Sequence, residues 1–300
     1  MLDNLMILFH APVFSADLFV NGMLIGAIFM LVAYGMALVW GVMNIINIAQ
    51  GEFVMMGGYV TLVLVKMGFN PLLGIPVSAI VMFFIGWLMY RTVIYRVVDR
   101  DVFTSLLATF GISILFAQLT NLIFGADVQT IDTGLGTWFF FNGDVTVAVI
   151  KVIAFVLALV LGLILWLFLK KSRTGQAIRA TAQNARAARI LGIDTHRIYA
   201  ITYSVSAAIC GAAGSLVVMA WAIHPYIGLP YTVRSFMVVV VAGLGNLPAV
   251  VIAGLGLGVA ENFAGFILGT EFQIAFVFIL MIAVLIWRNR ALQRHRKYLK

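Results

Sequence analysis

Charged residues and cysteine are scarce in this 300-residue sequence. Only 10% of the residues are Asp, Glu, Lys or Arg, whereas a soluble domain averages about 25%. With 63% hydrophobic residues and a mean hydropathy of +1.10, the chain cannot cover a water-facing surface, which excludes a soluble globular protein. The single cysteine, Cys210, excludes an internal disulfide and a thiolate metal cluster.

Motifs of catalysis are missing as well. The four histidines lie in predicted loops or termini without an HExxH pair, and no GxSxG element occurs. No G-x-x-x-x-G-K-[ST] segment is present, so the chain cannot cradle ATP phosphates itself. We therefore expect no enzyme activity, no catalytic or metal site and no cofactor bound by this chain. Because the first eighteen residues carry no Lys or Arg, we also expect no signal peptide.

Long apolar runs define the fold class. A bilayer core needs about 20 apolar residues per helix, and continuous rather than alternating runs argue against a barrel. The runs lie at 19–41, 48–66, 72–90, 102–124, 147–169, 198–222, 249–268 and 271–287. A further stretch, 235–248, is apolar and contains glycines but is too short to cross comfortably. The sequence predicts an all-α, polytopic transmembrane bundle, one domain over 1–300, with about eight spans and a short broken or re-entrant helix.

The distribution of Lys and Arg predicts the orientation. Basic residues cluster in 91–100, in 170–197 and in the tail 288–300, which we expect on the cytoplasmic side. The positive charge of the tail is explained by its cytoplasmic position at the membrane edge, so we expect no nucleic acid partner. The connection 125–146 has three Asp and no basic residue, so it is expected outside, with the N-terminus outside and the C-terminus inside. An even number of membrane crossings must then separate the last two basic segments, yet only three long runs lie between them. The stretch 235–248 must therefore enter or cross the membrane as well, as a broken helix that is buried in protein or lies beside a water-filled cavity.

The stretch MNIINIAQGEF places three amides and a carboxylate within nine positions: Asn44, Asn47, Gln50 and Glu52. Glu52 is the one charged residue between positions 18 and 65. One interpretation is a helix start, with Asn47 and Gln50 as a capping box and Glu52 at the positive end of the helix dipole. A compatible interpretation adds that this turn lines the inner mouth of a pathway, where amides hydrogen-bond a small polar solute.

Glu261 lies about 12 residues into its predicted span. An isolated carboxylate at that depth requires protonation, a partner or a water-filled cavity, so we expect it to face the bundle interior. The sequence leaves open whether Glu261 touches a solute or only ties helices together. Glycines four apart, at Gly22 and Gly26 and at Gly254 and Gly258, predict close helix packing.

The segment 170–197 is the longest predicted cytoplasmic loop. Its Ala-rich part, 181–191, has good helix propensity, and Gly192 is placed to end the helix. Ala182, Ala185 and Ala188 are expected to form a smooth surface between arginines. Two interpretations remain open, an interfacial helix held by anionic membrane lipid and a docking helix for a soluble partner.

Three segments together resemble the permease subunit of ATP-binding-cassette importers for branched-chain amino acids, the LivH type. They are GVMNIINIAQGEFVMMGGY, then RATAQNARAARILGID followed by AITYSVSAAICGAAGSL, and VVVAGLGNLPAVVIAGLGLGVAE. The similarity runs in order from about residue 19 to 287. Many members of this family carry a His where Gln50 stands, so a neutral amide replaces a titratable group.

The resemblance implies a subunit of the bacterial cytoplasmic (inner) membrane that imports branched-chain or other small amino acids by alternating access. It implies a second permease subunit, an extracytoplasmic solute-binding protein, and two cytoplasmic ATPase subunits that hold ATP and Mg. The implied coupling residues are Ala182, Ala185, Arg186, Ala188, Arg189, Leu191 and Gly192. The residues expected to line or support the path are Asn44, Asn47, Gln50, Glu52, Gly243, Gly245, Asn246 and Glu261.

Two other classes of transport protein remain open on the sequence. A stand-alone secondary transporter would use Glu261 or Glu52 as its proton or ion site. A channel would conduct without any partner. Within the resembling family, import of urea or of small organic acids is a further alternative, and the second permease could be a homologue or another copy of this chain.

Overall fold

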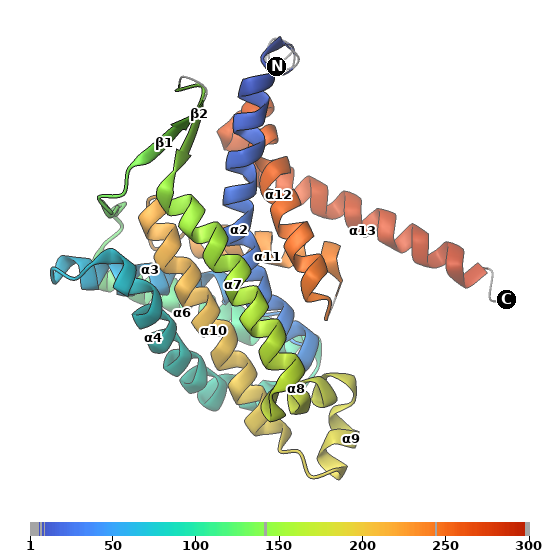
Figure 1. The fold of residues 1–300 in the computed structure, drawn as a ribbon. Coiled ribbons are helices and arrows are strands. Elements are labelled where there is room, and N and C mark those ends of the chain that lie inside the picture. The colour runs from blue at the N-terminus through green and yellow to red at the C-terminus, as the bar shows by residue number, and fades with distance from the viewer. Residues whose placement is uncertain (1–5, 7, 9, 141–142, 244, 298–300) are drawn as a thin grey trace.

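The computed structural model describes residues 6, 8, 10–140, 143–243 and 245–297, and it describes side chains up to residue 287. The side chains of the predicted basic tail, 288–300, lie outside the described residues. The described part is a helical bundle with one short hairpin (Figure 1).

Seven helices in the described part of the chain are long and apolar enough to cross a membrane. They are α2 (Pro12–Met43), α4 (Gly74–Met89) with its neighbours η1 (Pro71–Leu73), η2 (Tyr90–Ile94) and α5 (Tyr95–Val97), α6 (Val102–Phe124), α7 (Val149–Lys171), α10 (Thr195–Ala220), α12 (Leu247–Leu268), and α13 (Gln273–Lys297) with η4 (Thr270–Phe272) before it. Each coincides with a predicted apolar run, because a backbone in lipid must satisfy its own hydrogen bonds as a helix.

Two apolar helices are shorter, and both follow a long helix after an irregular link. α3 (Gln50–Lys66) has 17 residues and α11 (Gly228–Ala242) has 15. α3 occupies the predicted run 48–66, but it starts at a fully buried residue, Gln50, inside the bundle. The expected short helix in 235–248 begins instead at Gly228 and ends where Gly243 takes a φ of +82°.

The order of long helix, link, short helix and long helix therefore occurs twice, as α2–α3–α4 and as α10–α11–α12. The two triplets interlock, because α2 packs along α12 and α4 packs along α10. At the α2–α12 contact a Cβ on Gly258 would lie 2.4 Å from the Cα of Gly26. This confirms the predicted packing role of the glycines, since small residues let two helix backbones approach closely.

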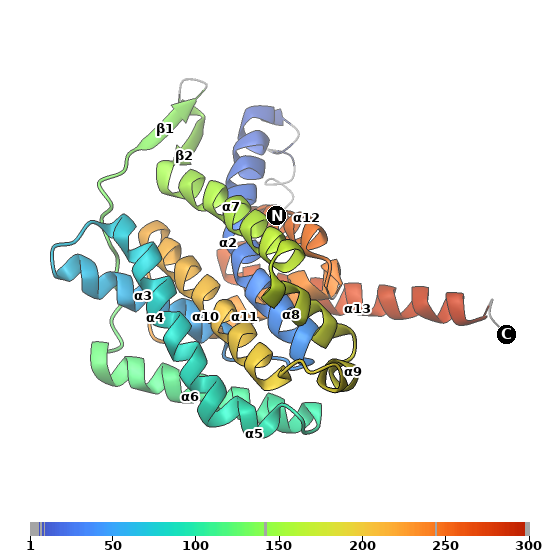
Figure 2. The ribbon, with the colours of Figure 1, turned by 60° about the horizontal axis from the view of Figure 1, so that its bottom comes forward.

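Burial separates central from peripheral helices. In the most apolar 18-residue window of α2, 89% of the residues are buried, compared with 17% for α7 and 6% for the window around α13. Figure 2 shows α2 running through the middle of the bundle, between α7 and α11. The peripheral helices present apolar side chains outward, as expected for surfaces that meet lipid.

A two-stranded antiparallel hairpin departs from the all-α prediction. Strands β1 (Thr137–Phe140) and β2 (Val145–Ala148) form it from aromatic and β-branched residues that favour strands, and β2 extends two residues past the connection 125–146. The side chain of Asp17 in α2 accepts a hydrogen bond from the backbone N–H of Thr146 (2.9 Å), and the amide of Asn21 donates to the Thr146 carbonyl (3.0 Å). These contacts fix the hairpin at the N-terminal end of α2.

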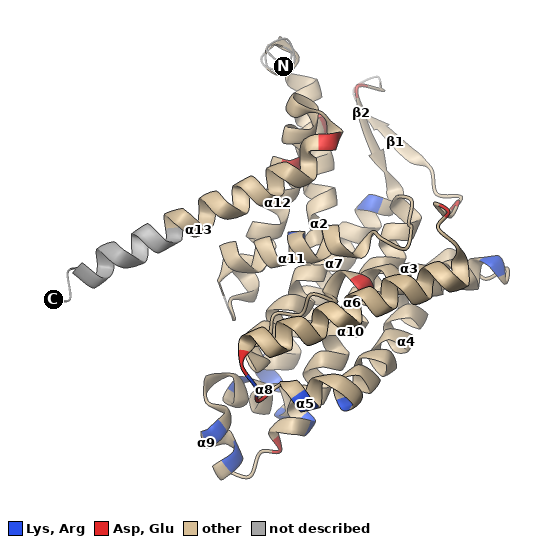
Figure 3. Cartoon of the chain, turned by 180° about the vertical axis from the view of Figure 1, so that it is seen from behind, with Lys and Arg blue, Asp and Glu red and all other residues tan. Residues whose placement is uncertain are grey.

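The two ends of the bundle differ in charge. Two short helices, α8 (Arg173–Gln183) and α9 (Ala185–Ile190), connect α7 to α10 at the end opposite the hairpin (Figure 1). Figure 3 shows Lys and Arg gathered around α5, α8 and α9 at this end.

Candidate functional site

The predicted polar stretch 44–52 lies where α2 gives way to α3. Asn44 ends α2 in the left-handed conformation (φ +54°), with its backbone N–H donating to the Trp40 carbonyl (3.0 Å). Its side chain is exposed, so it does not join the amides that follow it. A break at this point turns the next polar side chains into the bundle.

Asn47 and Gln50 form a buried amide cluster rather than the predicted capping box. The Asn47 side chain donates to Gln50 Oε1 (3.1 Å), and no side chain caps the start of α3. The Gln50 amide nitrogen donates to the sulfur of Cys210 (2.8 Å) and to the hydroxyl of Ser206 (3.2 Å) on α10. The capping prediction was wrong because α10 supplies polar partners that local sequence cannot reveal.

Glu52 lies in the first turn of α3, as predicted, and is buried between helices. Its Oε1 accepts a hydrogen bond from Ser113 of α6 (3.0 Å), whereas its buried Oε2 has no hydrogen-bond partner among the described residues. The carboxylate lies against the backbone of Gly228 at the start of α11, where a Cβ would be 2.3 Å from the carboxylate carbon. A buried carboxylate thus lies between the first turns of both short helices.

A threonine joins those two helix starts. The backbone N–H of Gly51 donates to the Thr232 hydroxyl (2.8 Å), and this hydroxyl donates to the Ile48 carbonyl (2.8 Å). A Cβ on Gly51 would lie 1.8 Å from the Gly228 carbonyl oxygen, so only glycine allows this approach. The sequence analysis missed Thr232 and Ser113 as partners of the polar stretch.

Glu261 faces the bundle interior, as predicted, and Arg234 of α11 is its partner. The guanidinium donates to both carboxylate oxygens at 2.5, 2.9 and 3.1 Å. The side chains of Arg234 and Glu261 are 13% and 6% exposed. Arg234 also lies over the rings of Phe29 (5.1 Å) and Tyr231 (5.8 Å). The sequence analysis missed Arg234, although it is the one Lys or Arg between Arg197 and Arg288.

The ion pair lines a cavity of about 400 Å³ between α2, α11 and α12. Its polar wall also includes His224, Asn262 and Gln273, while aromatic and aliphatic side chains form the rest. Asn262 donates to the Leu18 carbonyl of α2 (2.6 Å). An apolar cavity with one cation and one anion on its wall offers complementary groups to a zwitterion with an apolar side chain.

Gly243, Gly245 and Asn246 form the link between α11 and α12, away from the ion pair. Both glycines have positive φ (+82° and +78°), and the Asn246 side chain caps α12 by accepting from the Ala249 N–H (3.2 Å). Gly245 lines a separate cavity of about 380 Å³ together with Lys170 and Arg179. Apart from Asn44, whose side chain is exposed at the end of α2, the predicted path residues therefore lie in three places, namely the amide cluster with Glu52, the ion-pair cavity, and this basic end.

The predicted coupling helix 181–191 is two helices. Asn184, in extended conformation (φ −158°), separates α8 from α9 and caps α9 by accepting from the Ala187 N–H (3.0 Å). Ala182 and Ala185 thus lie on different helices, and Ala188 is buried within the chain, so the three alanines do not form the expected smooth surface. The helix propensity was right, but the prediction overlooked the cap at Asn184.

The outward tip of this segment is apolar. Ile190 is 81% exposed and Leu191 is 80% exposed, at the turn that Gly192 (φ +84°) completes as predicted. Arg186 is also exposed. We call Ile190 and Leu191 the apolar tip.

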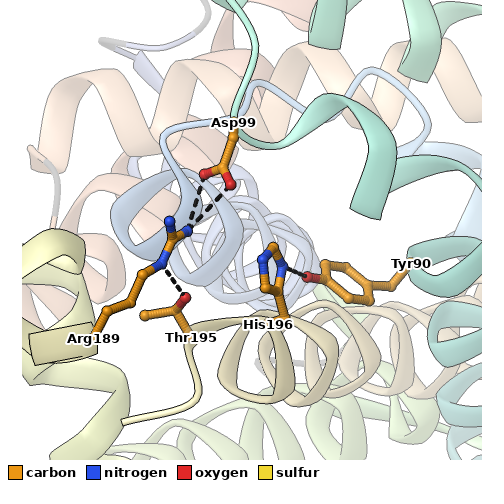
Figure 4. A network of polar contacts seen from close by, with 5 residues as sticks. All are labelled: Tyr90, Asp99, Arg189, Thr195 and His196. Carbon is orange, nitrogen blue, oxygen red and sulfur yellow. Dashed lines mark hydrogen bonds and ion pairs between the residues drawn. The ribbon is translucent and has the colours of Figure 1, made fainter. Parts of the chain in front are cut away.

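Arg189 holds the apolar tip against the rest of the bundle (Figure 4). Its guanidinium donates to both oxygens of Asp99 (3.1 and 3.2 Å) and to the Thr195 hydroxyl (2.7 Å) at the start of α10. The adjacent His196 contacts the Tyr90 hydroxyl on η2 (3.3 Å). Arg189 therefore ties α9 to the start of α10 and to the connection between α5 and α6.

The described residues contain no group of three or more His, Cys, Asp or Glu that could hold a metal ion. Their buried polar clusters offer hydrogen bonds and the Arg234–Glu261 ion pair, which can bind or orient a solute.

Comparisons with known proteins identify relatives over most of the chain. Residues 18–285 match the family model described as branched-chain amino acid transport system / permease component. The chain is 30% identical over 280 residues to the high-affinity branched-chain amino acid transport system permease protein LivH of Salmonella typhimurium, covering 89% of this chain and 91% of that protein. It is 31% identical over 284 residues to the corresponding permease protein BraD of Pseudomonas aeruginosa, covering 90% and 92%. No solved structure matches the chain.

Proposed function

The chain belongs to the family of branched-chain amino acid transport system permease components, and from this premise we propose that its solutes are branched-chain or other small amino acids. It is a membrane permease subunit of an ATP-binding-cassette importer. LivH and BraD are named as permease proteins of branched-chain amino acid transport systems, which supports this choice of solute.

We further propose the assembly in which the subunit works. A second permease, two cytoplasmic ATPases holding ATP and Mg, and an extracytoplasmic solute-binding protein complete the importer in the cytoplasmic (inner) membrane. The sequence lacks a phosphate-binding motif of its own, so the energy must enter through another chain. We treat 1–300 as a single permease domain.

Orientation follows from charge. The end that carries α5, α8 and α9 gathers Lys and Arg, which favours the cytoplasmic side. An even number of crossings must separate the basic segment 170–197 from the basic tail. α11 then supplies the crossing between α10 and α12 that makes the number even, and it runs from its start beside Glu52 to the basic end. We therefore propose that the N-terminus lies outside and the C-terminus inside.

The observation that carries the proposal is the apolar tip at this basic end. Ile190 and Leu191 are about 80% exposed. Each of these aliphatic side chains therefore lacks the roughly 1.5–3 kcal/mol of stabilisation that its burial would provide. A groove on an ATPase would bury them, and the contacts of Arg189 would transmit its movement to α10. We therefore assign coupling to the apolar tip and Arg186, supported by the buried Ala188 and by the contacts of Arg189.

We place the solute path along the ion-pair cavity and the buried amide cluster. Arg234 and Glu261 can exchange their mutual contact for the carboxylate and ammonium groups of an amino acid without leaving a net charge buried. The main competing function is an ion-driven secondary transporter, which the unpaired Glu52 Oε2 favours as a proton site.

The test uses the tagged chain solubilised gently from native membranes. We expect ATPases and a second permease to co-purify, and reconstituted vesicles to take up labelled leucine with ATP. The variant Ile190→Asp/Leu191→Asp should reach the membrane normally but lose the ATPases and uptake. Val128→Asp, an exposed apolar position in the connection 125–146, serves as the control. Retained ATPase binding in the tip variant would overturn the coupling assignment, and uptake that follows an ion gradient without ATP would establish the competitor.

A further inference from the structure

A second polar cavity, unrelated to the ion pair, lies at the basic end between the last turns of α4, η2 and α5 and the first turns of α10. It has a volume of about 620 Å³. Its charged lining consists of Arg91, Arg96, Arg197 and Asp194, with His196 beside them, and its aromatic lining consists of Trp87, Tyr90 and Tyr95. Three arginines against one aspartate give this cavity an excess of positive charge, which suits an anion. We call it the arginine groove.

In the described part of the chain no hydrogen bond or ion pair engages the guanidinium groups of Arg91 and Arg197, which keep their donors free for a ligand, whereas Arg96 donates to the Thr92 carbonyl. The described residues contain two salt bridges, Arg189–Asp99 and Arg234–Glu261, and neither involves the arginine groove. Asp194 is engaged at the start of α10, where its carboxylate accepts from the Arg197 backbone N–H (3.1 Å). Arg91 lies over the ring of Trp87 (5.5 Å), which orients the guanidinium without using its N–H groups.

A separate apolar cavity lies further along the same pair of helices. It has a volume of about 380 Å³ and is lined by Ala79, Ile80, Phe83 and Phe84 of α4 and by Ala208 of α10. Ile80, Phe84, Trp87 and Arg91 follow one another at spacings of four, three and four residues, so they share one face of the helix. From Ile80 to Arg91 the helix rises by about 16 Å, close to half of a bilayer core of about 30 Å.

We propose that this face binds one anionic phospholipid of the cytoplasmic leaflet. The phosphate lies in the arginine groove between Arg91 and Arg197, and an acyl chain lies along Ile80, Phe84 and Ala208. A soluble phosphate would leave the apolar cavity unfilled, and a zwitterionic lipid would leave the excess positive charge uncompensated. The choice of leaflet rests on the orientation proposed above.

Figure 4 shows two residues of the arginine groove, Tyr90 and His196, beside the residues that support the apolar tip. Tyr90 and His196, which line the arginine groove, contact each other across it (3.3 Å). Thr195, next to His196, accepts the hydrogen bond from Arg189 that holds α9. A bound head group thus packs against the residues that set the position of α9, so lipid occupancy and coupling to the ATPases are expected to change together.

The experiment measures lipid retention by the purified complex in mixed micelles, using native mass spectrometry. Dioleoylphosphatidylglycerol and dioleoylphosphatidylcholine are titrated separately, and glycerol phosphate is added as a soluble competitor. We compare wild type with Arg91→Gln/Arg197→Gln. The control is Lys171→Gln/Arg173→Gln, which removes the same charge from exposed positions outside the groove.

We expect the anionic lipid to be retained in preference, and the groove variant to bind it about 25-fold more weakly, from about fivefold per arginine. The control should stay within about twofold of wild type. Equal retention of the two lipids, equal loss in the control, or full displacement by millimolar glycerol phosphate would overturn the proposal. The transport function is tested separately, because failure of the lipid site leaves ATP-dependent leucine uptake by the wild type measurable.

Discussion

The Arg234–Glu261 pair allows a direct test of whether the buried ions hold the helices or handle the solute. The perturbation is a set of three variants, Glu261→Leu, Arg234→Met and the two together. Each single change leaves one ion in an apolar wall beside Phe29 and Tyr231 without its counterion. The double change replaces the pair with apolar side chains of similar length.

The magnitude follows from burial and geometry. Both side chains are less than 15% exposed, and three N–O contacts of 2.5 to 3.1 Å join them. Removing one partner of such a pair costs about 3–5 kcal/mol, whereas replacing both is often close to neutral. The adjacent cavity of about 400 Å³ can admit water, which favours the lower value. A loss of about 3 kcal/mol corresponds to a more than hundredfold fall in the folding equilibrium constant.

Thermal unfolding of a fluorescent fusion in detergent measures stability, and labelled leucine uptake measures transport. We expect both single variants to unfold at much lower temperature and the double variant to recover to nearly the wild-type value. If the pair contacts the solute, the double variant will be stable but inactive, which is the result we expect. Normal uptake by the double variant would refute the assignment of the pair to the path. Wild-type stability in both single variants would refute the burial argument itself.

Two further predictions concern packing and the amide cluster. Gly258→Ala should destabilise the protein by about 1–3 kcal/mol in the same unfolding assay, because its Cβ would meet the backbone of Gly26, whereas Gly256→Ala, with open space around it, should be neutral. Equal effects of the two would contradict the close-contact explanation. Gln50→Leu should cost about 1–3 kcal/mol, because it strands the polar groups of Asn47 and Ser206 in the core. Cys210→Ala, which removes one weak partner, should be milder, and the reverse order would show that the cluster is held by other contacts.

The bounds of a helix could be predicted from the sequence where contact with lipid alone determines which residues are helical. The run 102–124 is α6 with the same bounds, because Asp101 caps its start and Gly125 ends it. The run 147–169 differs from α7 by only two residues at each end. In these segments apolar composition and backbone hydrogen bonding lead to the same answer without reference to neighbours.

Contacts between segments that are distant in the sequence could not be predicted from it. The start of α3 depends on Ser206 and Cys210, more than 150 positions away, so reading Asn47 and Gln50 as a local cap missed their role. Arg234 could have been found, because a buried carboxylate requires a partner and few cations were available. Asn184 could also have been found, since an asparagine three residues before a helical N–H is a common cap. The exposure of Ile190 and Leu191 could not have been predicted, because it depends on how the contacts of Arg189 hold α9.

The interlocked triplets have a consequence for synthesis. α2 buries most of its surface against helices that include α12, yet some 200 residues separate the end of α2 from the start of α12. At about 5–20 residues per second, α2 waits roughly 10–40 s in the membrane before its partner is made. During that interval the face of α2 that carries Gly22 and Gly26 is open to lipid or to other proteins. Until the last third of the sequence has been inserted, the nascent chain therefore depends on lipid or another protein to cover that face of α2.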